Sequence, residues 1–420
     1  MTDPAILHAT MLAGLAKHQA GDAAGALTEY RAVLAQFPDH PDALNLGAQA
    51  LRALGRIDEA LDLAARACAV LPRNAAFHAN RAAILLDAKS YDAARDAAAA
   101  AIAADATHVP GWINRAAARA ASGDDANAES DYRNALRLAP GSAEARNNLG
   151  NLLQRQGRID EALSEYEAAI AANPHHREAH SNYGTALYAL QRAGQGTKAA
   201  TLARQWAQAY PDSATARHIA SALAGGDVAT RAPDAYVRDA FDMFAPTFEA
   251  TLAKLDYRAP QVLDELLARH LKQPLPVGRA LDAGCGTGLA APMLRARATV
   301  LDGVDLSGGM VARAQERNLY DGLRVGELIA DLKAHEGAYD LIVAADVLCY
   351  FGDLAEVLAA AAAALKAGGG LAFSVERLID ARPSETWRVR PSGRYAHAAE
   401  TLSAMLRATG FAEIAIEPQS

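Results

Sequence analysis

Basic residues, aromatic residues and cysteine are all scarce in this chain of 420 residues. Its 41 lysine and arginine side chains are outnumbered by 49 acidic ones, which gives a net charge of −8, and no dense basic run is present to capture nucleic acid or an anionic membrane. Three scattered cysteines with no CxxC pair exclude a disulfide framework and an iron–sulfur cluster, and no metal is expected. Without a leader-like start or an apolar run of about 18 residues, the sequence predicts a cytoplasmic protein with no membrane-inserted segment.

Alanine supplies most of the apolar content, because hydrophobic residues reach 51% while aromatic residues reach only 6%. Alanine is the best helix former and fills little volume, so this composition favours closely packed helices. A length of 420 residues predicts two or three domains.

Small residues recur at a constant step of 34 in the first half. They are Gly14, Ala48, Ala82, Ala116, Gly150 and Gly184. A fixed period of this length predicts stacked antiparallel helix pairs. Five uninterrupted copies cover residues 7–40, 41–74, 75–108, 109–142 and 143–176. A sixth copy follows, and we expect its turn to be three residues longer because Gly194 falls late.

The copy at 143–176 carries Leu149-Gly150, Gly157, Tyr166 and Pro174, and through them it resembles the tetratricopeptide family. The resemblance implies an all-α superhelix over residues 1–213 with a concave face that binds a protein or peptide.

Four asparagines keep the same step of 34 residues in the first helix of their copies: Asn80, Asn114, Asn148 and Asn182. A carboxamide both donates and accepts hydrogen bonds. The set resembles the asparagine ladder in the repeat domain of the O-GlcNAc transferases, which implies that it binds the backbone of an extended peptide. Alternatively, these amides hydrogen-bond only within the repeats.

A strand, a glycine-rich turn, a helix, a second strand and another helix follow from Arg279, as expected of a βαβ unit. Gly284, Gly286 and Gly288 remove side chains where a ligand approaches the backbone. Their spacing is G-x-G-x-G, whereas a dinucleotide fingerprint would read G-x-G-x-x-G. The second strand ends at Asp305, a carboxylate with two accepting oxygens.

The letters DAGCGTG, with LSGGM after Asp305, resemble motif I of the class I S-adenosylmethionine-dependent methyltransferases. The resemblance implies an α/β, Rossmann-like domain over residues 261–420 with S-adenosyl-L-methionine as its cofactor. Asp305 would accept the ribose hydroxyls, and Asp282 would lie near the methionine ammonium. Asp331 competes with Glu327 for the adenine amino group. The implied cofactor contacts are Asp282, Gly284, Gly286, Gly288, Asp305, Leu306, Met310, Glu327, Leu328 and Asp346.

Residues 214–260 form the expected helical linker and cofactor lid. Phe241, Phe244 and Phe248 are spaced to share one helix face. The run FDMFAPTFEATLAKLDYRAP resembles the lead-in of a bacterial family of methyltransferases that carry tetratricopeptide repeats, which read FDxxAxxFDxxL and then LxYRxP. The resemblance implies that Tyr257 and Arg258 reach the methionine carboxylate, although Arg258 alternatively pairs with a surface acid.

The strand YDLIVAAD ends at Asp346, and Tyr350 follows at an edge where ligands bind in α/β sheets. No DPPY or NPPY follows, and the paired-glutamate loop of arginine methyltransferases is missing. The segment with Arg394, Tyr395 and His397 resembles the family's S-G-R-Y-x-H. A histidine can take the acceptor's proton while Tyr395 and Tyr350 orient the acceptor. Alternatively, His397 only caps the next helix.

The last predicted strand, FAEIAIEPQS, stands where class I enzymes continue into one further strand. Either the chain is clipped there or its sheet ends short and leaves an edge exposed.

The sequence therefore predicts a methyltransferase whose acceptor is a protein or peptide captured by the repeat groove. One alternative is a small-molecule or glycan methyltransferase that its repeats dock to a complex. Another is a scaffold that binds the cofactor without reacting. The sequence names neither the acceptor atom nor the oligomeric state.

Overall fold

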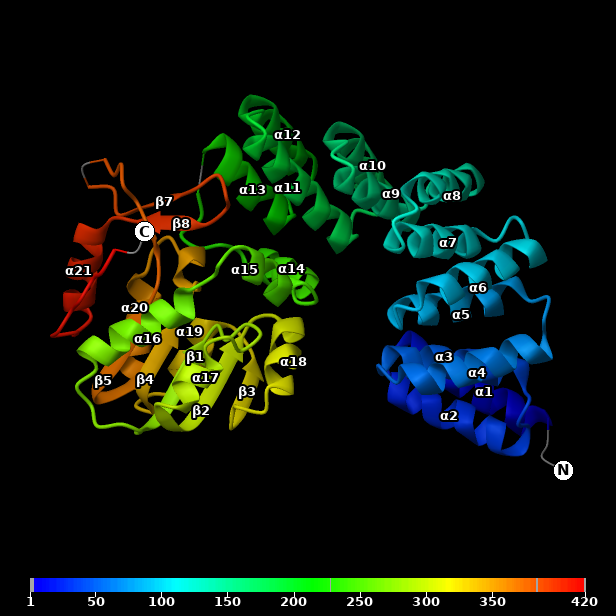
Figure 1. Ribbon diagram of the computed structural model, residues 1–420, viewed down its shortest axis with the longest axis horizontal. Helices are drawn as coiled ribbons and strands as arrows, with labels where there is room; N and C mark the ends of the chain where they lie inside the picture. Colours follow the sequence, from blue (N-terminus) through cyan, green and yellow to red (C-terminus); the bar gives the residue numbers. More distant parts are fainter. Residues whose placement is uncertain (1–3, 227, 383, 419–420) are drawn as a thin grey trace. The chain divides into compact units, whose positions relative to one another are not determined.

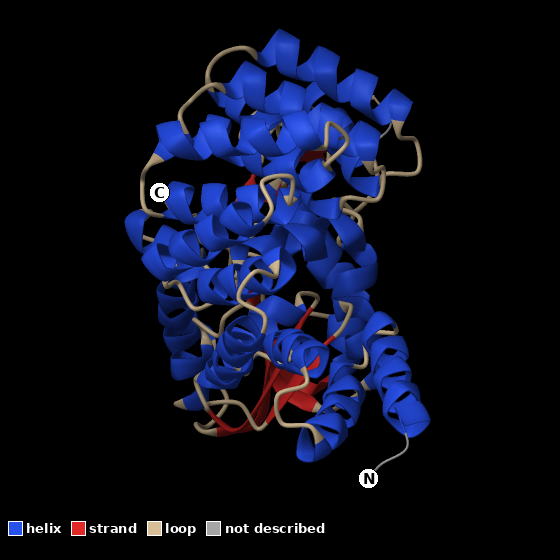
Figure 2. Cartoon of the chain, turned by 90° about the vertical axis from the view of Figure 1, so that its right-hand side faces the viewer, coloured by secondary structure: helices blue, strands red, loops and turns tan. Residues whose placement is uncertain are grey.

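A computed structural model describes residues 4–226, 228–382 and 384–418 of the chain, which divides into two units, residues 1–179 and 180–420. The described part of the first unit contains helices and loops and no strand (Figure 2). Nowhere in the described ranges is a helix long and apolar enough to span a bilayer.

Antiparallel helix pairs build the first unit, one pair for each copy of the repeat (Figure 1). The helices are α1 (Pro4–Gln19), α2 (Ala23–Gln36), α3 (Pro41–Ala53), α4 (Ile57–Val70), α5 (Ala75–Asp87), α6 (Tyr91–Ala104), α7 (Val109–Ala121), α8 (Asp125–Leu138), α9 (Ala143–Arg155) and α10 (Ile159–Ala172). The predicted repeat pairs are confirmed.

The recurring small residue lets the two helices of a pair approach each other. A Cβ added at Gly150 would lie 2.5 Å from the Tyr166 ring, and one added at Gly14 would lie 2.6 Å from the Tyr30 ring. Both tyrosines are fully buried. A larger residue at this position would force these close-packed helices apart.

The second unit begins within α11 (Arg177–Arg192) and continues through α12 (Gly196–Ala209), α13 (Ala214–Ala224), α14 (Asp234–Phe244), α15 (Phe248–Lys254) and α16 (Ala259–His270). The expectation of a longer turn in the sixth copy is wrong. The extra residues lengthen α11 to 16 residues, against 13 in α9, because Ala189, Leu190 and Gln191 are good helix formers.

A parallel sheet with strand order β3-β2-β1-β4-β5 forms the centre of this unit (Figure 1). Its strands are β1 (Val277–Ala283), β2 (Ala298–Asp305), β3 (Gly322–Val325), β4 (Tyr339–Ala344) and β5 (Leu365–Phe373). The strand order reverses between β1 and β4. Ligands of open α/β sheets bind at such a switch point, beyond the carboxyl ends of the strands.

Helices cover both faces of the sheet, with α16 and α17 (Ala291–Arg295) on one face and α19 (Leu328–Ala334), α20 (Ala355–Ala364) and α21 (Ala399–Ala408) on the other. Helix α18 (Gly308–Glu316) follows β2 and packs beside β3. A small second sheet joins β6 (Glu376–Arg377), β8 (Tyr395–His397) and β7 (Trp387–Val389), and a short 3-10 turn, η1, spans Leu348–Tyr350.

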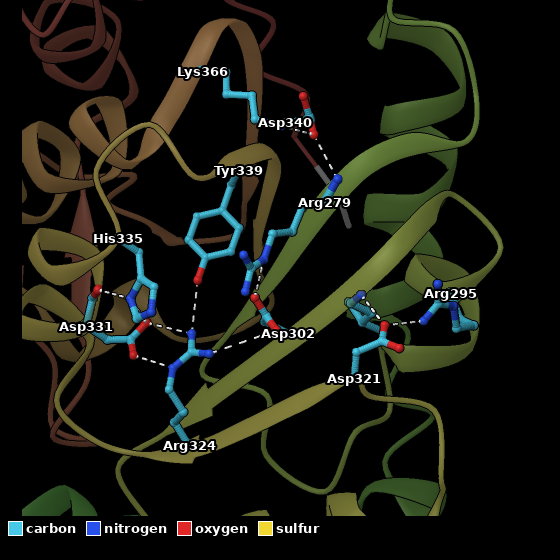
Figure 3. Close-up of polar contacts among 11 residues, drawn as sticks. Arg279, Arg295, Asp302, Asp321, Arg324, Asp331, His335, Tyr339, Asp340 and Lys366 are labelled. Atoms are coloured by element: carbon cyan, nitrogen blue, oxygen red, sulfur yellow. Dashed lines mark hydrogen bonds and ion pairs between the residues drawn. The ribbon is translucent and has the colours of Figure 1, made fainter.

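A charged network ties together four strands of the sheet (Figure 3). Asp302 of β2 is 2% exposed, and its Oδ2 accepts a hydrogen bond of 2.7 Å from Nε of Arg279 on β1. Arg324 of β3 donates to Asp331 at 2.6 Å and to the Tyr339 hydroxyl of β4 at 3.0 Å. Each arginine of the network is paired with an aspartate. The network therefore stabilises the strand order and does not offer an unpaired charge to a ligand.

The last predicted strand is wrong over the described residues 411–418, which form neither helix nor strand. Its apolar residues Phe411 and Ile414 pack on the core beneath α20 and α21. Glu413 pairs with Lys272, and Glu417 pairs with Arg269 and His270 at the end of α16. These contacts hold the segment by its side chains instead of by a strand ladder.

Candidate functional site

A cavity of about 240 Å³ opens beyond the carboxyl ends of β1, β2 and β4. Its lining combines the glycine turn after β1, the ends of β2 and β4, the linker before α14, and the apolar faces of α14 and α15. This is the switch point that the strand order identifies.

Asp305 at the end of β2 is fixed by the backbone around it. Its Oδ2 accepts from the Gly286 N–H at 2.9 Å, and its Oδ1 accepts from the Ser307 N–H at 2.8 Å. Burial raises the pKa of Asp305, and these backbone N–H groups oppose that rise. Each oxygen keeps a second lone pair, so the carboxylate can accept two more hydrogen bonds from a ligand in the cavity.

Gly284 and Gly286 also line the cavity, and both have positive φ, at 72° and 53°. A Cβ added at Gly284 would lie 2.3 Å from the Val347 side chain, whereas a Cβ at Gly286 would meet no atom within 4 Å. The turn therefore leaves backbone open to a ligand at Gly286. Gly288 is not in the lining, and a Cβ there would meet Arg317 at 2.9 Å.

Asp282 lies behind the glycine turn and not in the lining of the cavity. It is 1% exposed, and the Tyr320 hydroxyl donates to its Oδ2 at 2.6 Å. Burial raises the pKa of Asp282 to about 7, the hydrogen bond from Tyr320 opposes the rise, and the nearby Asp305 adds to it. In the described part of the chain neither carboxyl forms an ion pair with a basic side chain, so a cationic ligand would favour their charged forms.

Glu327 lines the cavity together with Leu306 and Leu328. Its Oε2 caps α19 by accepting from the Ala330 N–H at 2.8 Å, and its Oε1 accepts from Arg231 Nη1 at 2.9 Å. Of the two acids that the sequence offered, the structure thus brings Glu327 to the cavity and places Asp331 in the charged network. Met310 is fully buried and outside the lining.

Arg231 is a cavity residue that sequence reasoning missed. It lies in the linker before α14, 96 residues from Glu327, and its guanidinium also lies 5.5 Å from the centre of the Phe351 ring.

Asp242 of α14 was missed as well. It accepts from the Ser307 hydroxyl at 2.5 Å and from the Gly309 N–H at 3.0 Å, which ties α14 to the start of α18.

The three phenylalanines of the linker line the cavity, but the single helix expected to carry them is wrong. Pro246 cannot continue a helix, so α14 ends at Phe244 and α15 begins at Phe248. The rings still meet, with centres 6.3 Å apart for Phe241 and Phe248 and 5.2 Å apart for Phe244 and Phe248. Phe241 also contacts Tyr350 edge-on at 5.5 Å, so the aromatic cover reaches the end of β4.

Asp346 at the end of β4 adopts the left-handed backbone, with φ of 58°. Such strain in a residue other than glycine is typical of functional sites. Its Oδ1 accepts from the Ser374 hydroxyl at 3.1 Å and lies 3.5 Å from Arg394 Nη2. Arg394 also pairs with Glu376 at 2.8 Å. Tyr257 and Tyr350 line the same end of the cavity, and burial raises the pKa of both phenols.

His397 and Tyr395 are not among the residues that line the cavity. Nε2 of His397 lies 2.9 Å from the Phe351 carbonyl oxygen and 3.2 Å from that of Gly352, and burial lowers the pKa of His397. The Tyr395 hydroxyl donates to the Ala229 carbonyl at 2.8 Å. Both residues therefore hold the cavity rim from behind. Nε2 of His397 and the hydroxyl of Tyr395 thus both contact backbone carbonyls, and His397 does not cap α21.

Arg258 also lies outside the lining, with a side chain that is 61% exposed and 3.9 Å from Glu265. The alternative of a surface pair fits this geometry.

Two of the four predicted asparagines contact the preceding copy. Nδ2 of Asn80 donates to Oδ1 of Asn45 at 2.9 Å, and Nδ2 of Asn114 donates to the Ala79 carbonyl at 2.8 Å. Asn148 is half-buried in the first unit, while Asn182 lies in the second unit. The alternative that the sequence left open was hydrogen bonding within a repeat, whereas Asn80 and Asn114 each use one N–H to bond to the neighbouring repeat.

Models of known families match both parts of the chain. A model described as a methyltransferase domain matches residues 254–416. Models described as tetratricopeptide repeats match residues 17–84, 113–162 and 147–214. Together with the helix pairs and the parallel sheet, these matches confirm the two fold types that the sequence predicts.

Curated relatives are similar to part of the chain. Methyltransferase-like protein 27 of Homo sapiens is 38% identical over 105 residues, which are 24% of this chain and 43% of that protein. Ubiquinone biosynthesis O-methyltransferase of Marinobacter nauticus is 32% identical over 102 residues, 23% of this chain and 43% of that protein. The enzyme of the same name from Hahella chejuensis is 30% identical over 142 residues, 32% of this chain and 54% of that protein. The chain spans about half the length of the curated relatives it matches.

Solved repeat proteins resemble part of the chain. A thermophilic tetratricopeptide-repeat protein of Thermus thermophilus is 24% identical with a TM-score of 0.40, and the match covers 43% of this chain and 98% of that one. PilW, a type IV pilus biogenesis factor, is 15% identical with a TM-score of 0.45, and the match covers 52% of this chain and 99% of that one.

Proposed function

We propose that this chain, which joins tetratricopeptide repeats to a class I methyltransferase domain, transfers a methyl group from S-adenosyl-L-methionine to a protein or peptide. One observation carries the choice of cofactor. The Asp305 carboxylate is held by two backbone N–H groups at the mouth of a glycine turn and faces an aromatic-lined cavity.

The residues around the cavity fit this cofactor. Asp305 would accept the two ribose hydroxyls, Glu327 would accept from the adenine amino group, and Leu306 and Leu328 would pack on the adenine ring. The open backbone at Gly286 leaves room for the methionine part. Asp282, Met310 and Gly288 would support this site from behind. Phe241, Phe244 and Phe248 present π-systems, which attract a cation such as a sulfonium.

When bound, the cofactor supplies an electrophilic methyl group on its sulfonium. Transfer of that group is an in-line displacement, so the chain must align the acceptor, exclude water and accept a proton. The α14 and α15 rings would exclude water. Asp346 is a better candidate than His397 to accept the proton of the acceptor, because Ser374 and Arg394 hold its Oδ1 and leave its Oδ2 for the acceptor. Tyr350 and Tyr257 would orient the acceptor at the same end.

The protein or peptide acceptor is proposed from the repeats. Stacked helix pairs of this kind offer an extended concave surface to a partner. Asn80 and Asn114 each use one N–H between repeats, while their side-chain oxygens accept no hydrogen bond in the described part of the chain. Those oxygens would accept from the N–H groups of an extended peptide.

A small-molecule acceptor is the second candidate. The cavity is lined by aromatic rings and closed by the linker, as pockets for small ligands are. Two of the relatives are named for O-methylation in ubiquinone biosynthesis, which favours a small hydroxyl-bearing acceptor for this chain as well. In that case the repeats would dock the enzyme to a complex.

Calorimetric titration of the full chain tests the choice of cofactor. We expect saturable binding of S-adenosyl-L-methionine and of S-adenosylhomocysteine and no binding of NAD, whose pyrophosphate requires the other glycine spacing. Preference for NAD would overturn the proposal.

A further inference from the structure

The turn from Arg390 to Arg394, between β7 and β8, carries a cavity residue at its end. Its backbone closes through the Arg390 N–H, which donates to the Arg394 carbonyl at 2.7 Å, and the Gly393 N–H, which donates to the Arg390 carbonyl at 2.8 Å. Gly393 has a φ of 80°, which other residues rarely adopt. Arg394 then lines the cavity beside Asp346. The position of Arg394 at the acceptor end therefore depends on this turn.

Side chains of α11, α13 and α14 hold the turn from outside the cavity. Nε2 of His218, on α13, lies 2.9 Å from the Gly393 carbonyl oxygen. A Cβ added at Gly393 would lie 2.4 Å from the hydroxyl of Tyr188, on α11, and 2.8 Å from the hydroxyl of Tyr236, on α14. Glycine is thus required there both by its φ and by the two phenols.

His218 is held in one state by these surroundings. It is 3% exposed, and its ring centre lies 4.5 Å from that of Tyr236 and 6.1 Å from that of Tyr395. A carbonyl oxygen only accepts, so Nε2 carries the proton and donates to Gly393. Nδ1 is buried without a partner. A bond of this kind fixes the turn only while α13 stays in place.

Helix α13 also supports the cover of the cavity. Tyr236 packs on His218, and its neighbour Val237 lines the cavity with Phe241 one helical turn further along α14. A displaced His218 would thus disturb two walls of the cavity together, the one with Arg394 and the one formed by α14.

We infer that His218 is a positioning residue for the acceptor end of the cavity. On this view α13, together with α11 of the sixth copy, serves as the base of the methyltransferase site, whereas copies one to five remain available to partners. The inference rests on the proposed function, because it assigns the acceptor to the end with Asp346 and Arg394. The cofactor residues bond to other segments, because Asp305 accepts from the Gly286 N–H and Glu327 accepts from Arg231.

Three variants of the full chain test the inference. His218→Ala removes the hydrogen bond, and His218→Gln restores a donor of similar reach. His180→Ala is the matched control, because His180 is a buried histidine of α11 that accepts a hydrogen bond from Trp206 Nε1 at 3.2 Å.

Three measurements separate positioning from general loss of structure. Amide hydrogen exchange reports on residues 388–397, calorimetry gives the affinity for S-adenosylhomocysteine, and transfer of labelled methyl from S-adenosyl-L-methionine to a cell lysate gives turnover. We expect His218→Ala to speed exchange in the turn and slow transfer, each by about tenfold, with cofactor affinity kept within about twofold. We expect His218→Gln to recover most of the transfer and His180→Ala to leave exchange in the turn unchanged.

The outcomes that overturn the inference are distinct from those that overturn the proposed function. Unchanged exchange in His218→Ala, equal effects of His218→Ala and His180→Ala, or no recovery by His218→Gln would refute the positioning role. A wild-type chain that binds the cofactor but transfers no methyl group would refute the proposed function, and hydrogen exchange would then decide the positioning role by itself.

Discussion

Asp305 and Asp302 lie three residues apart on β2, and we expect their substitution to have opposite effects on cofactor binding and on folding. Both are buried, but Asp305 faces the cavity while Asp302 belongs to the charged network inside the unit. Asp305→Ala should therefore abolish cofactor binding with little effect on folding. Asp302→Asn should weaken folding and leave binding by the folded chain intact.

The expected magnitudes follow from the contacts of each carboxylate. A hydrogen bond to a charged group contributes about 1.5–3 kcal/mol, so losing two of them to ribose hydroxyls weakens binding by roughly 10²- to 10⁴-fold. Burial already raises the pKa of Asp305, so the charged side chain stabilises the unit little. Asp302→Asn breaks a partly buried pair with Arg279, whose side chain is 40% exposed, and should lower the free energy of unfolding by about 2 kcal/mol.

Calorimetry with S-adenosylhomocysteine and urea unfolding of the same samples provide the two readouts. An Asp305→Ala chain that binds within about threefold of the wild type would refute the assignment of the cavity to this cofactor. So would an Asp302→Asn chain that folds but has lost binding, because the network would then be part of the ligand site.

Three further predictions follow from neighbouring groups. Because burial raises the pKa of Asp282 to about 7 and a cationic cofactor favours the charged form, cofactor affinity should rise with pH up to about 7 and then level off. Calorimetry at pH 6 in buffers of different ionisation heat should show that the wild-type chain releases a proton to the buffer when the cofactor binds. For Asp282→Asn the cofactor affinity should not vary with pH in this range. Proton release by that variant would contradict the reasoning. Arg231→Ala removes the linker's ion pair with Glu327 and should weaken cofactor binding by about three- to tenfold, whereas the control Arg295→Ala, whose pair with Asp321 lies outside the cavity, should not. Burial lowers the pKa of His397, so the unfolded chain binds more protons than the folded chain below about pH 6.5. The free energy of unfolding, measured with urea, should therefore fall as the pH drops from about 7 to 5.5. If a His397→Gln chain loses the same free energy over this range, His397 is not the cause of the loss.

Local patterns explain what the sequence predicts well. The 34-residue step of small residues identifies the helix pairs because each pair requires a close approach, as at Gly150 and Tyr166. The glycine turn and Asp305 lie in one βαβ unit, so their spacing alone brings them together. Long-range contacts are different: Arg231 meets Glu327 from 96 residues away, and no short motif records that pair.

Long-range contacts also explain where the structure differs from the expectations for the phenylalanines and for His397. Phe241 and Phe248 meet across a helix break at Pro246, so their common position comes from tertiary packing and not from one helix face. His397 has the residue type and motif of a proton acceptor, but burial and two backbone carbonyls hold it behind the rim. Its place is set by the pairing of β8 with β6 and β7, which the sequence alone does not specify.

Transfer of a labelled methyl group tests the central proposal most directly. The full chain and its Asp305→Ala variant are each incubated with methyl-labelled S-adenosyl-L-methionine and a cell lysate, and label is counted in the protein and small-molecule fractions. The account predicts label in the protein fraction with the wild type and none above background with Asp305→Ala. Label confined to small molecules would contradict the protein acceptor, and equal labelling by the two chains would contradict the site itself.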